Sequence, residues 1–396
     1  MSSDVRSPSD VAAGDDGRAL VLGGRLVASQ GRWWLVDAFA RIEVEPPSAH
    51  DFRDGSLAVL AGTLRGGRLI AGDTRLLQHP GSSARELARV GDGGLARRLR
   101  LRSEILTAVR DFFQRDGFLE VDTPIRVSEC APEAQIDPFE SGDHCLVTSP
   151  ELHMKRLLVG GVPRLFQLVH CFREDELGSL HAPEFMMLEW YRAFAPLEAV
   201  MADTERLISE LCARFSGGPR LSLASGVALD VTLPFLRITV RDAFRRFAGV
   251  DDAARLALSD EDTYFQTLVD RVEPALAALD RPVFLCEYPA SQAALARLAP
   301  RDPSVAERFE LYLGGIELCN GYGELNDAAE QRRRFALDLE RRRQRGHERP
   351  ALPERFLDAL EQGMPPAAGN ALGMERLIML LLGEPSIDRI RPFPEA

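Results

Sequence analysis

Lysine is almost missing from this chain of 396 residues: lysine and arginine together number 48, and Lys155 is the only lysine. A reaction that needs several lysine side chains as bases is therefore excluded. The chain also offers almost no lysine of its own that an activated acyl group could modify. With 60 acidic residues the net charge is −12, and an acidic chain is a poor general nucleic-acid binder because contacts to phosphates dominate such binding.

Cysteine clusters and long apolar runs are missing as well. The six cysteines stand singly and form no Cys-x-x-Cys pair, so the sequence predicts neither a zinc site nor a disulfide framework. The longest apolar run, near Leu377–Leu382, is far too short to cross a bilayer. No apolar segment follows Met1, and we therefore expect a cytoplasmic protein without a secretory signal or a membrane anchor.

The first 95 residues change character twice. Residues 1–17 are rich in Ser, Asp, Gly and Ala, a composition that predicts a disordered tail. Residues 18–78 hold short β-like runs separated by glycine-containing turns, which predicts a small all-β domain, most simply an OB-like barrel. Residues 79–95 are rich in glycine and predict a linker.

A long amphipathic helix follows the linker, carries apolar residues from Leu101 to Phe113 on one face and ends at Gly117. Residues 96–396 are predicted to form one domain that mixes helices with strands. The arginine-rich helix expected within residues 328–346 is interpreted as a solvated surface.

The segment Phe172-Arg-Glu-Asp-Glu176, followed by His181 and Phe185, combines a cation, acidic groups and an aromatic ring. It resembles motif 2 of class II aminoacyl-tRNA synthetases, in which two antiparallel strands are joined by a loop. These enzymes join a carboxylate to the α-phosphate of ATP, so negative charge builds up at phosphorus. A guanidinium at Arg173 can hold that charge through two parallel hydrogen bonds. The resemblance implies that Phe185 stacks on adenine and that His181 reaches the terminal phosphate.

Two further blocks stand on either side of this segment in the order of the same family. Gly117-Phe-Leu-Glu-Val-Asp-Thr-Pro124 resembles motif 1, which builds the dimer interface, and therefore implies a homodimer. Gly369-Asn-Ala-Leu-Gly-Met-Glu-Arg376 resembles motif 3. Gly373 would let the backbone approach ATP closely, and Arg376 would cover the other face of adenine and reach the γ-phosphate.

Two segments narrow the resemblance to lysyl-type enzymes. Gly315-Ile-Glu-Leu-Cys-Asn-Gly-Tyr-Gly-Glu324 resembles their Gly-x-Glu-Leu block, which implies that Glu317 holds Mg²⁺ on the ATP phosphates. Thr148-Ser-Pro-Glu151 resembles the segment that recognises the substrate amino group. The acidic and hydroxyl groups of the site would form a negative pocket that suits a dication such as lysine; these groups are Glu151, Tyr191 and Glu324.

The resemblance implies a fold and a set of site residues. The fold is α+β: a class II synthetase-type antiparallel sheet, flanked by helices and preceded by the OB-like domain. The catalytic residues are expected to be Arg173 and Arg376. The residues expected to bind ATP are Arg173, Glu174, Asp175, His181, Phe185, Glu317, Leu318, Gly373 and Arg376. The residues expected to bind the amino acid are Ser149, Pro150, Glu151, Tyr191, Glu324 and Ala371. The Mg²⁺ ligands are expected to be Glu317 and Glu324.

Three features favour the elongation factor P–lysine ligases over the lysyl-tRNA synthetases. Residues 288–296 and 153–158 resemble the corresponding segments of the ligases, and Ala371 stands where the tRNA enzymes usually have glycine. A methyl group there would crowd an α-amino group but tolerate the methylene of (R)-β-lysine. The resemblance thus implies a ligase that activates lysine or (R)-β-lysine with ATP and Mg²⁺ and passes it to a lysine of elongation factor P.

Three departures from the ligase pattern keep two alternatives open. The additional domain at residues 18–78 favours a short lysyl-tRNA synthetase. The two adjacent tryptophans of this domain could stack on RNA bases. The domain is only mildly basic, because eight arginines against six acidic residues give it a net charge of +2. Asp175 replaces Glu and Ala182 replaces Asn, which favours a non-catalytic synthetase-like binding or regulatory protein. On a regular strand Glu174 and Glu176 point to the other face, so we do not expect them to replace Asp175.

Overall fold

The computed structural model describes residues 4–81, 90, 94–346 and 350–394 of the chain. The chain divides into two compact units, Met1–Leu101 and Arg102–Ala396. Among the helices of the described residues, none is both long and apolar enough to cross a membrane.

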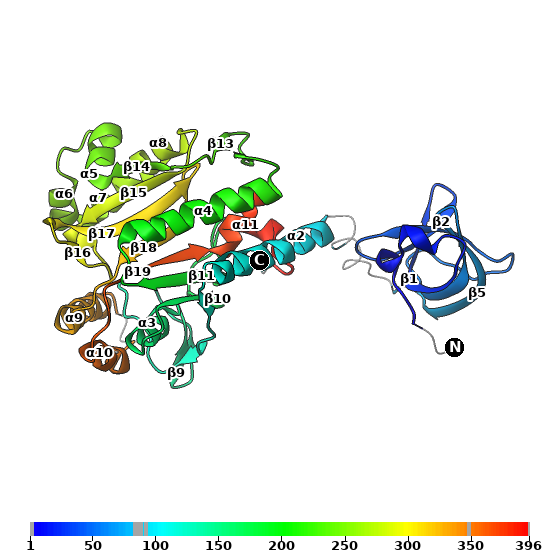
Figure 1. Cartoon of the computed structure of the whole chain (residues 1–396), viewed down its shortest axis with the longest axis horizontal. Coiled ribbons are helices and arrows are strands. Elements are labelled where there is room, and N and C mark those ends of the chain that lie inside the picture. Colours follow the sequence, from blue (N-terminus) through cyan, green and yellow to red (C-terminus); the bar gives the residue numbers. More distant parts are fainter. Residues whose placement is uncertain (1–3, 82–89, 91–93, 347–349, 395–396) are drawn as a thin grey trace. The chain divides into compact units, whose positions relative to one another are not determined.

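The first unit is a closed barrel with the strand order β1-β2-β3-β5-β4 (Figure 1). Its strands are β1 Ala19–Ser29, β2 Arg32–Val36, β3 Arg41–Glu45, β4 Leu57–Arg65 and β5 Arg68–Gln78. Side chains alternate between the two faces of a strand, and the inward leucines fill the barrel; they include Leu22, Leu26, Leu35, Leu60 and Leu69, which are fully buried. The predicted small OB-like β domain is therefore confirmed.

Residues 4–17 differ from the disordered tail that the composition predicted. They form two short 3-10 helices, Pro8–Asp10 and Ala13–Asp15. Asp15 is buried, accepts a 2.8 Å hydrogen bond from Arg6 and also accepts one from the Ala12 amide. Local caps and one ion pair thus order a segment whose polar composition alone indicated disorder.

Most of the predicted linker, residues 79–95, lies outside the described residues, since 82–89 and 91–93 are not described. The helix predicted after it is α2, Leu95–Arg115. The chain leaves this helix through Gly117, whose φ of 75° lies in the left-handed region that glycine adopts without strain.

The second unit is built on a large sheet with the strand order β14-β15-β17-β18-β19-β11-β10-β6, in which β16 also pairs with β17. Neighbouring strands are antiparallel except for the pairs β14–β15 and β10–β6. The strands are β6 Leu119–Glu120, β10 Arg164–Phe172, β11 Glu184–Ala193, β14 Leu236–Thr239, β15 Val283–Pro289, β16 Leu298–Ala299, β17 Asp302–Leu313, β18 Ile316–Gly323 and β19 Ala367–Gly373. The predicted antiparallel sheet flanked by helices is confirmed.

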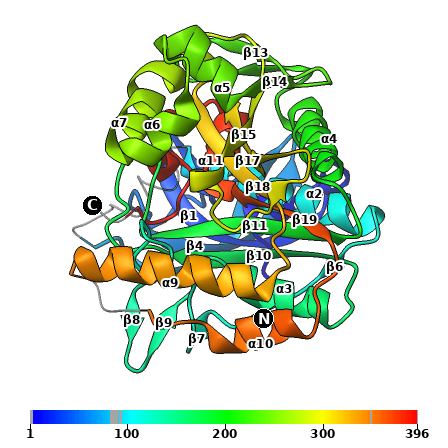
Figure 2. The same cartoon turned by 90° about the vertical axis from the view of Figure 1, so that its left-hand side faces the viewer.

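One face of this sheet is covered by α2, α4 Leu197–Phe215 and α11 Met374–Leu382 (Figure 1). Phe166, Trp190, Leu372 and Phe309 point from four strands into this apolar core and are fully buried. Because side chains alternate along each strand, the intervening residues point to the opposite face, called the open face here. The α3 (Glu151–Val159), α9 (Ala328–Gln344) and α10 (Glu354–Glu361) helices pack around one end of that face (Figure 2).

A helical insertion separates β14 from β15 and buries its own cluster around Phe244 and Tyr264. Its elements are α5 Val240–Ala243, α6 Ala253–Ser259, α7 Glu261–Thr267 and α8 Glu273–Ala277, with two π-helical turns at Phe244–Ala248 and Leu268–Val272. The remaining strands form a hairpin, β12 Arg220–Ser222 with β13 Ala228–Asp230, and a small sheet of β7 Arg126–Val127, β9 His144–Leu146 and β8 Glu140–Ser141.

A disulfide joins Cys130 to Cys145, which the sequence analysis did not predict. The two cysteines are 15 residues apart, a spacing that matches no recognised pattern. They meet because Val127 on β7 pairs with Cys145 on β9, which returns the chain beside the residues that follow β7. The remaining four cysteines are free thiols.

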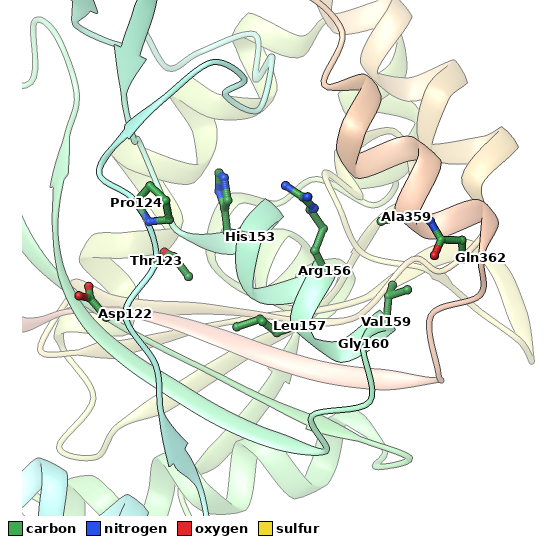
Figure 3. Close-up of a pocket in the computed structure, with 10 residues that line it drawn as sticks. All are labelled: Asp122, Thr123, Pro124, His153, Arg156, Leu157, Val159, Gly160, Ala359 and Gln362. Carbon is green, nitrogen blue, oxygen red and sulfur yellow. The ribbon is translucent and has the colours of Figure 1, made fainter.

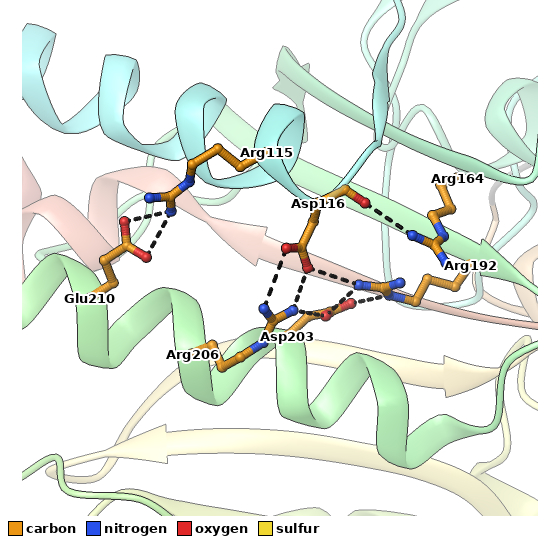
Figure 4. A network of polar contacts seen from close by, with 7 residues as sticks. All are labelled: Arg115, Asp116, Arg164, Arg192, Asp203, Arg206 and Glu210. Atoms are coloured by element: carbon orange, nitrogen blue, oxygen red, sulfur yellow. Dashed lines mark hydrogen bonds and ion pairs between the residues drawn. The ribbon is translucent and has the colours of Figure 1, made fainter.

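A network of ion pairs ties the end of α2 to β10, β11 and α4 (Figure 4). Asp203 accepts hydrogen bonds from Arg192 at 2.5 and 2.7 Å and from Arg206 at 2.8 Å. Asp116 binds the same two arginines, and its carbonyl accepts from Arg164. Two carboxylates and two guanidinium groups therefore balance in charge at this junction.

Candidate active site

A row of side chains crosses the open face of the sheet. Cross-strand pairing places five residues side by side from β10 to β17, and neighbouring strands lie about 4.8 Å apart. In order they are Gln167, Glu189, Ala371, Asn320 and Glu310. Two carboxylates, two amides and one methyl group therefore lie side by side on one face of the sheet.

Glu189 lies near one end of this row and is almost fully buried. Its carboxylate accepts hydrogen bonds from the Tyr191 hydroxyl at 2.5 Å and from the Ser149 hydroxyl at 2.8 Å. Burial, followed by the neighbouring charge of Glu151, raises the pKa of Glu189 to about 8. Glu189 was not among the site residues expected from the sequence.

Lys155 stands between two further carboxylates, one from α3 and one from the end of β18. Its side chain is fully buried, contacts Glu151 one helical turn earlier, and lies 2.5 Å from Glu324 Oε2. Burial alone would lower the pKa of Lys155, but Glu151 and Glu324 raise it above its ordinary value. Burial raises the pKa of Glu324 to about 7, although Lys155 opposes that rise. Two carboxylates therefore contact this one ammonium group, and the charge of Glu151 also acts on Glu189.

Gly369 lets two of the expected amino-acid-binding residues approach each other. A Cβ at this position would lie 2.3 Å from Cε1 of Tyr191 and 2.7 Å from Oε1 of Glu324, and both contacts are sterically forbidden. Glu324 Oε1 is buried and has no hydrogen-bond partner among the described residues. A buried oxygen without a donor is costly, and such an atom is typical of a position at which a bound ligand supplies the missing donor.

The two predicted catalytic arginines lie where motifs 2 and 3 were expected. The Arg173 guanidinium lies 5.2 Å from the ring centroid of Phe185, and its Nη1 atom is 3.4 Å from Glu176. Arg376 donates to the Glu317 carbonyl at 2.7 Å and lies 2.6 Å from Nε2 of His181. Burial, followed by Arg376, lowers the pKa of His181. Two guanidinium groups, an aromatic face and an imidazole are therefore available to a polyanionic nucleotide.

Gly373 supports this fit to a nucleotide. A Cβ there would meet nothing closer than Arg376 Cδ at 3.9 Å, so the protein itself does not require glycine at this position. Gly373 is also the N-cap of α11, and the first amides of a helix favour an anion. The missing side chain therefore leaves room beside a helix N-terminus for a group that is not part of the chain.

The loop after Arg173 corrects the expectation based on strand alternation. The β10 strand ends at Phe172, and Asp175 has a φ of 63°, so residues 173–176 form a turn rather than a regular strand. Glu176 consequently lies beside Arg173, whereas the Glu174 amide donates to the Asp137 carbonyl. The argument that Glu176 points away from the site is therefore wrong.

One expected ATP-binding residue, Leu318, lies elsewhere in the fold. Leu318 is buried in the apolar core on the covered face, so its side chain does not reach the open face. Ala182 is also buried in that core. Pro150 is the N-cap of α3, and Glu151 is the first residue of that helix. Pro150 therefore contributes to the site by fixing the backbone from which Glu151 projects.

Glu317 and Glu324 are the two expected Mg²⁺ ligands, and the structure places them far apart. The two residues stand at opposite ends of β18, and seven residues of extended chain span about 23 Å at roughly 3.3 Å per residue. Glu324 is also occupied by Lys155. Glu310 is the closer acidic neighbour: burial and then the charge of Glu310 raise the pKa of Glu317 to about 7. No group of three or more metal-ligating side chains occurs within the described ranges.

Glu310 anchors a second polar cluster at the other end of the row. It accepts hydrogen bonds from Arg308 at 2.5 Å, from Tyr288 at 2.5 Å and from Tyr312 at 2.7 Å. Arg308 also donates to Asn320 at 3.3 Å. Sequence reasoning missed Glu310 because a single glutamate in an apolar strand carries no motif of its own.

An open hollow of about 510 Å³ lies on the other side of α3 (Figure 3). His153, Arg156 and Leu157 line it from α3, and Asp122–Pro124 line it from the motif 1 segment. Glu151 and Lys155 are not among its lining residues. The hollow is therefore separate from the carboxylate cluster, and its position beside motif 1 relates it to the expected dimer interface.

Comparison with known proteins agrees with this arrangement. The family model for tRNA synthetases class II (D, K and N) matches residues 87–396. The chain therefore belongs to this class II synthetase family, as its sheet and the order of its motifs predicted. Residues 1–86, which contain the barrel, lie outside the match.

Within the family, the match to one group runs over nearly the whole length of its members. The elongation factor P–(R)-β-lysine ligase of Hamiltonella defensa is 37% identical over 313 residues, which are 74% of this chain and 93% of that protein. That of Proteus mirabilis is 38% identical with the same coverage. The lysine–tRNA ligase of Dehalococcoides mccartyi is 37% identical over 318 residues, but these are only 63% of that protein.

Proposed function

We propose that this chain is an ATP-dependent ligase that activates lysine or (R)-β-lysine as an aminoacyl-adenylate and transfers it to a lysine of elongation factor P. The observation that carries the proposal is the cluster of three carboxylates, Glu151, Glu189 and Glu324, together with Arg173 directly after β10 and Arg376 in the first turn of α11. An acidic pocket binds ammonium groups, and paired guanidinium groups bind phosphates. The proposal is also supported by the similarity of this chain to two proteins named for this activity, which extends over 93% of the length of each.

Activation would proceed by attack of a substrate carboxylate oxygen on the α-phosphorus of ATP, with pyrophosphate as the leaving group. Arg173 would hold the negative charge that builds up on the phosphoryl oxygens, and such fixed donors act most strongly in the transition state. Phe185 and Arg376 would hold the two faces of the adenine ring. The acceptor amine would then attack the carbonyl carbon of the anhydride, lose a proton and release AMP.

We also propose that Glu317 and Glu310 hold Mg²⁺ together with the ATP phosphates. Mg²⁺ typically takes one or two protein carboxylates plus phosphate oxygens and water, so two neighbouring acids suffice. The ion would neutralise phosphate charge and thereby make the α-phosphorus easier to attack. The register of β17 and β18 supports the assignment, because Glu317 pairs with Tyr312, which lies two residues from Glu310 on β17.

The amino-acid end of the site is proposed to lie over Ala371, Glu189 and Tyr191. Ala371 stands between Glu189 and Asn320 in the row, so its methyl group would project beside the substrate carbon that bears the carboxylate. (R)-β-lysine has an unbranched methylene there and fits this position better than α-lysine. The proposal therefore includes a preference for (R)-β-lysine.

A short lysyl-tRNA synthetase remains the second candidate, because the barrel outside the family match is an OB-like fold of a kind that binds nucleic acids. Trp34 lies on the outer face of the barrel, and the Arg41 guanidinium carbon is 4.5 Å from the centroid of its ring. A nucleic-acid base could stack on this pair. We propose the ligase first because the match to lysine–tRNA ligase leaves more than a third of that protein uncovered.

We further propose a cytoplasmic homodimer formed through the motif 1 region, residues 117–124.

Transfer of radiolabelled substrate separates these functions. Purified chain, ATP and labelled lysine or (R)-β-lysine would be incubated with elongation factor P in one reaction and with tRNA in another. We expect label on elongation factor P and none on tRNA. Label on tRNA alone would establish the second candidate, whereas absence of label and of pyrophosphate exchange with every amino acid would support a non-catalytic binding protein.

A further inference from the structure

The only lysine of the chain is buried inside the amino-acid pocket. Lys155 is fully buried, and its Nζ atom bridges Glu151 on α3 and Glu324 at the end of β18. Nothing in the proposed reaction uses this ammonium group directly. A buried charge is costly to desolvate, so its presence beside three acids calls for a local role.

The two oxygens of Glu324 differ in their distance to a cation. Neither oxygen makes a hydrogen bond of good geometry among the described residues, but Oε2 lies 2.5 Å from Lys155 Nζ and forms an ion pair with it. Oε1 is directed at the space above Gly369, where an added Cβ would come within 2.7 Å of it. The Tyr191 ring borders the same space. Oε1 therefore lies next to Gly369 and the Tyr191 ring, which pair on the open face of the sheet.

We propose that Lys155 is a positioning residue for the amino-acid substrate: it holds Glu324 through one carboxylate oxygen and presents the other to an ammonium group of the substrate. This inference rests on the proposed function, because it assumes a substrate with two ammonium groups. With all groups ionised, three carboxylates and one lysine leave two negative charges. The pocket would thus match a diammonium amino acid in number of charges as well as in sign.

Removing Lys155 should change how the pocket titrates. Glu151 and Glu324 would become neighbouring buried acids without a cation, and such a pair takes up a proton. The pKa of Glu324 is about 7 with Lys155 present, so a further rise of about one to two units would reduce its ionised fraction at pH 7 by roughly 5- to 50-fold. The charged and titratable groups that face this pair from neighbouring elements are Glu133, Glu189, Tyr191, Arg297 and Tyr322.

The first test compares Lys155→Met with Arg156→Met. Arg156 is the next residue of the same helix but lines the separate hollow (Figure 3), so it is the matched control for removal of a positive charge. Pyrophosphate exchange with lysine gives KM and kcat between pH 6.5 and 9. For Lys155→Met we expect KM to rise about 5- to 50-fold at pH 7 and to approach within about twofold of wild type at pH 9, with kcat changed by less than about twofold. Arg156→Met should match wild type throughout.

A KM that is unchanged at pH 7, or one raised equally at every pH, would overturn the proposal. An equal rise would indicate that Lys155 merely supports the fold. Absence of exchange in the wild type with every amino acid would instead refute the proposed function, so the two failures are distinguishable.

A second test does not depend on a folded variant or on turnover. Because Lys155 is the only lysine, labelling the protein with [¹³Cε,¹⁵Nζ]lysine gives a single side-chain signal by NMR. We expect that signal to remain that of an ammonium group from pH 6 to pH 10, and to shift when unlabelled (R)-β-lysine or lysine occupies the other oxygen of Glu324. Norleucine, which lacks the second ammonium group, should cause no shift. A signal that titrates like that of an exposed lysine, or one that does not respond to the diamino acids, would contradict the proposal.

Discussion

The second unit contains two clusters of buried charge that differ in their balance. In the network at the α2–α4 junction, Asp116 and Asp203 meet Arg192 and Arg206 (Figure 4). In the open face of the sheet, Lys155 contacts Glu151 and Glu324, and the charge of Glu151 acts in turn on Glu189. The first cluster is neutral within the protein, whereas the second has two more acids than cations.

The difference is visible in how the acids titrate. A hydrogen bond from Arg206 is the main reason that the pKa of Asp116 is lowered. Burial and the charge of Glu151 raise the pKa of Glu189 to about 8. A balanced cluster therefore stabilises the folded chain by itself, while the unbalanced one takes up protons until a cationic ligand replaces them. This contrast separates a structural ion network from a binding site without reference to any motif.

Removal of Asp203 should have the largest effect on stability. Asp203→Ala leaves Arg192, which is 13% exposed, with only part of its counter-charge. Breaking a buried ion pair on one side costs about 3–5 kcal/mol, and we expect a loss of that size in the free energy of unfolding from urea denaturation. The exposed pair Arg115–Glu210 provides the control, since Glu210→Ala should cost less than about 1 kcal/mol. Equal effects of the two substitutions would contradict the importance of a buried, balanced network.

Removal of Arg173 should have the largest effect on activity. Arg173→Ala deletes the guanidinium that would hold charge on the phosphoryl group, and such a loss costs at least about a hundredfold in rate. Lysine-dependent and Mg²⁺-dependent pyrophosphate exchange measures it. Arg164→Ala, which removes an arginine that donates to the Asp116 carbonyl, should leave the exchange rate unchanged. A similar loss in both variants would mean that Arg173 acts through the fold.

Substitution of Ala371 should change the choice of substrate rather than the rate. Ala371→Gly removes one methyl group between Glu189 and Asn320. One such group in a binding site typically changes the discrimination between two substrates by roughly 1–3 kcal/mol, or about 10–200-fold in the ratio of their kcat/KM values. We expect the wild type to prefer (R)-β-lysine and the variant to shift toward α-lysine by a factor in that range. The measurement is kcat/KM for both amino acids; an unchanged ratio would remove Ala371 from the specificity argument.

Removal of the barrel should have the smallest effect on activation. A chain that begins at Leu95 keeps the whole of α2 and every residue of the two charged clusters. Because the two compact units have separate cores, we expect adenylate formation to change by less than about twofold. Loss of adenylate formation in a truncated chain that is still folded would show that the barrel takes part in catalysis.

The sequence predicted those parts of the site that lie within short segments. The motif order placed Arg173, Phe185 and Arg376 in one domain, and glycine-containing turns predicted the barrel. These predictions depend on local spacing, which a sequence displays directly.

The parts that sequence analysis missed depend on cross-strand register or on distant partners. Glu189 stands two residues before Tyr191, so strand alternation alone could have placed it on the same face. Lys155 follows Glu151 by four residues, a helical spacing that predicts an ion pair, but its second partner Glu324 is far away in the sequence. Glu317 and Glu324 were both expected to bind Mg²⁺ because they share a segment, but that segment is an extended strand that sets the two residues far apart. Cys130 and Cys145 were missed because tertiary pairing brings them together.

Glu189→Gln tests the contrast between the two clusters most directly. An unfolded glutamate loses its proton near pH 4.5, whereas folded Glu189 retains it up to about pH 8, so ionisation of Glu189 destabilises the folded chain increasingly as the pH rises from 4.5 to 8. We predict that Glu189→Gln raises the free energy of unfolding at pH 8 by roughly 1–4 kcal/mol, leaves it nearly unchanged at pH 4.5, and raises KM for lysine at least about tenfold. The opposite result would be a Glu189→Gln variant that is less stable than wild type at pH 8, as Asp203→Ala is expected to be, and that has an unaltered KM for lysine. That result would show that Glu189 belongs to a structural network and would contradict the account.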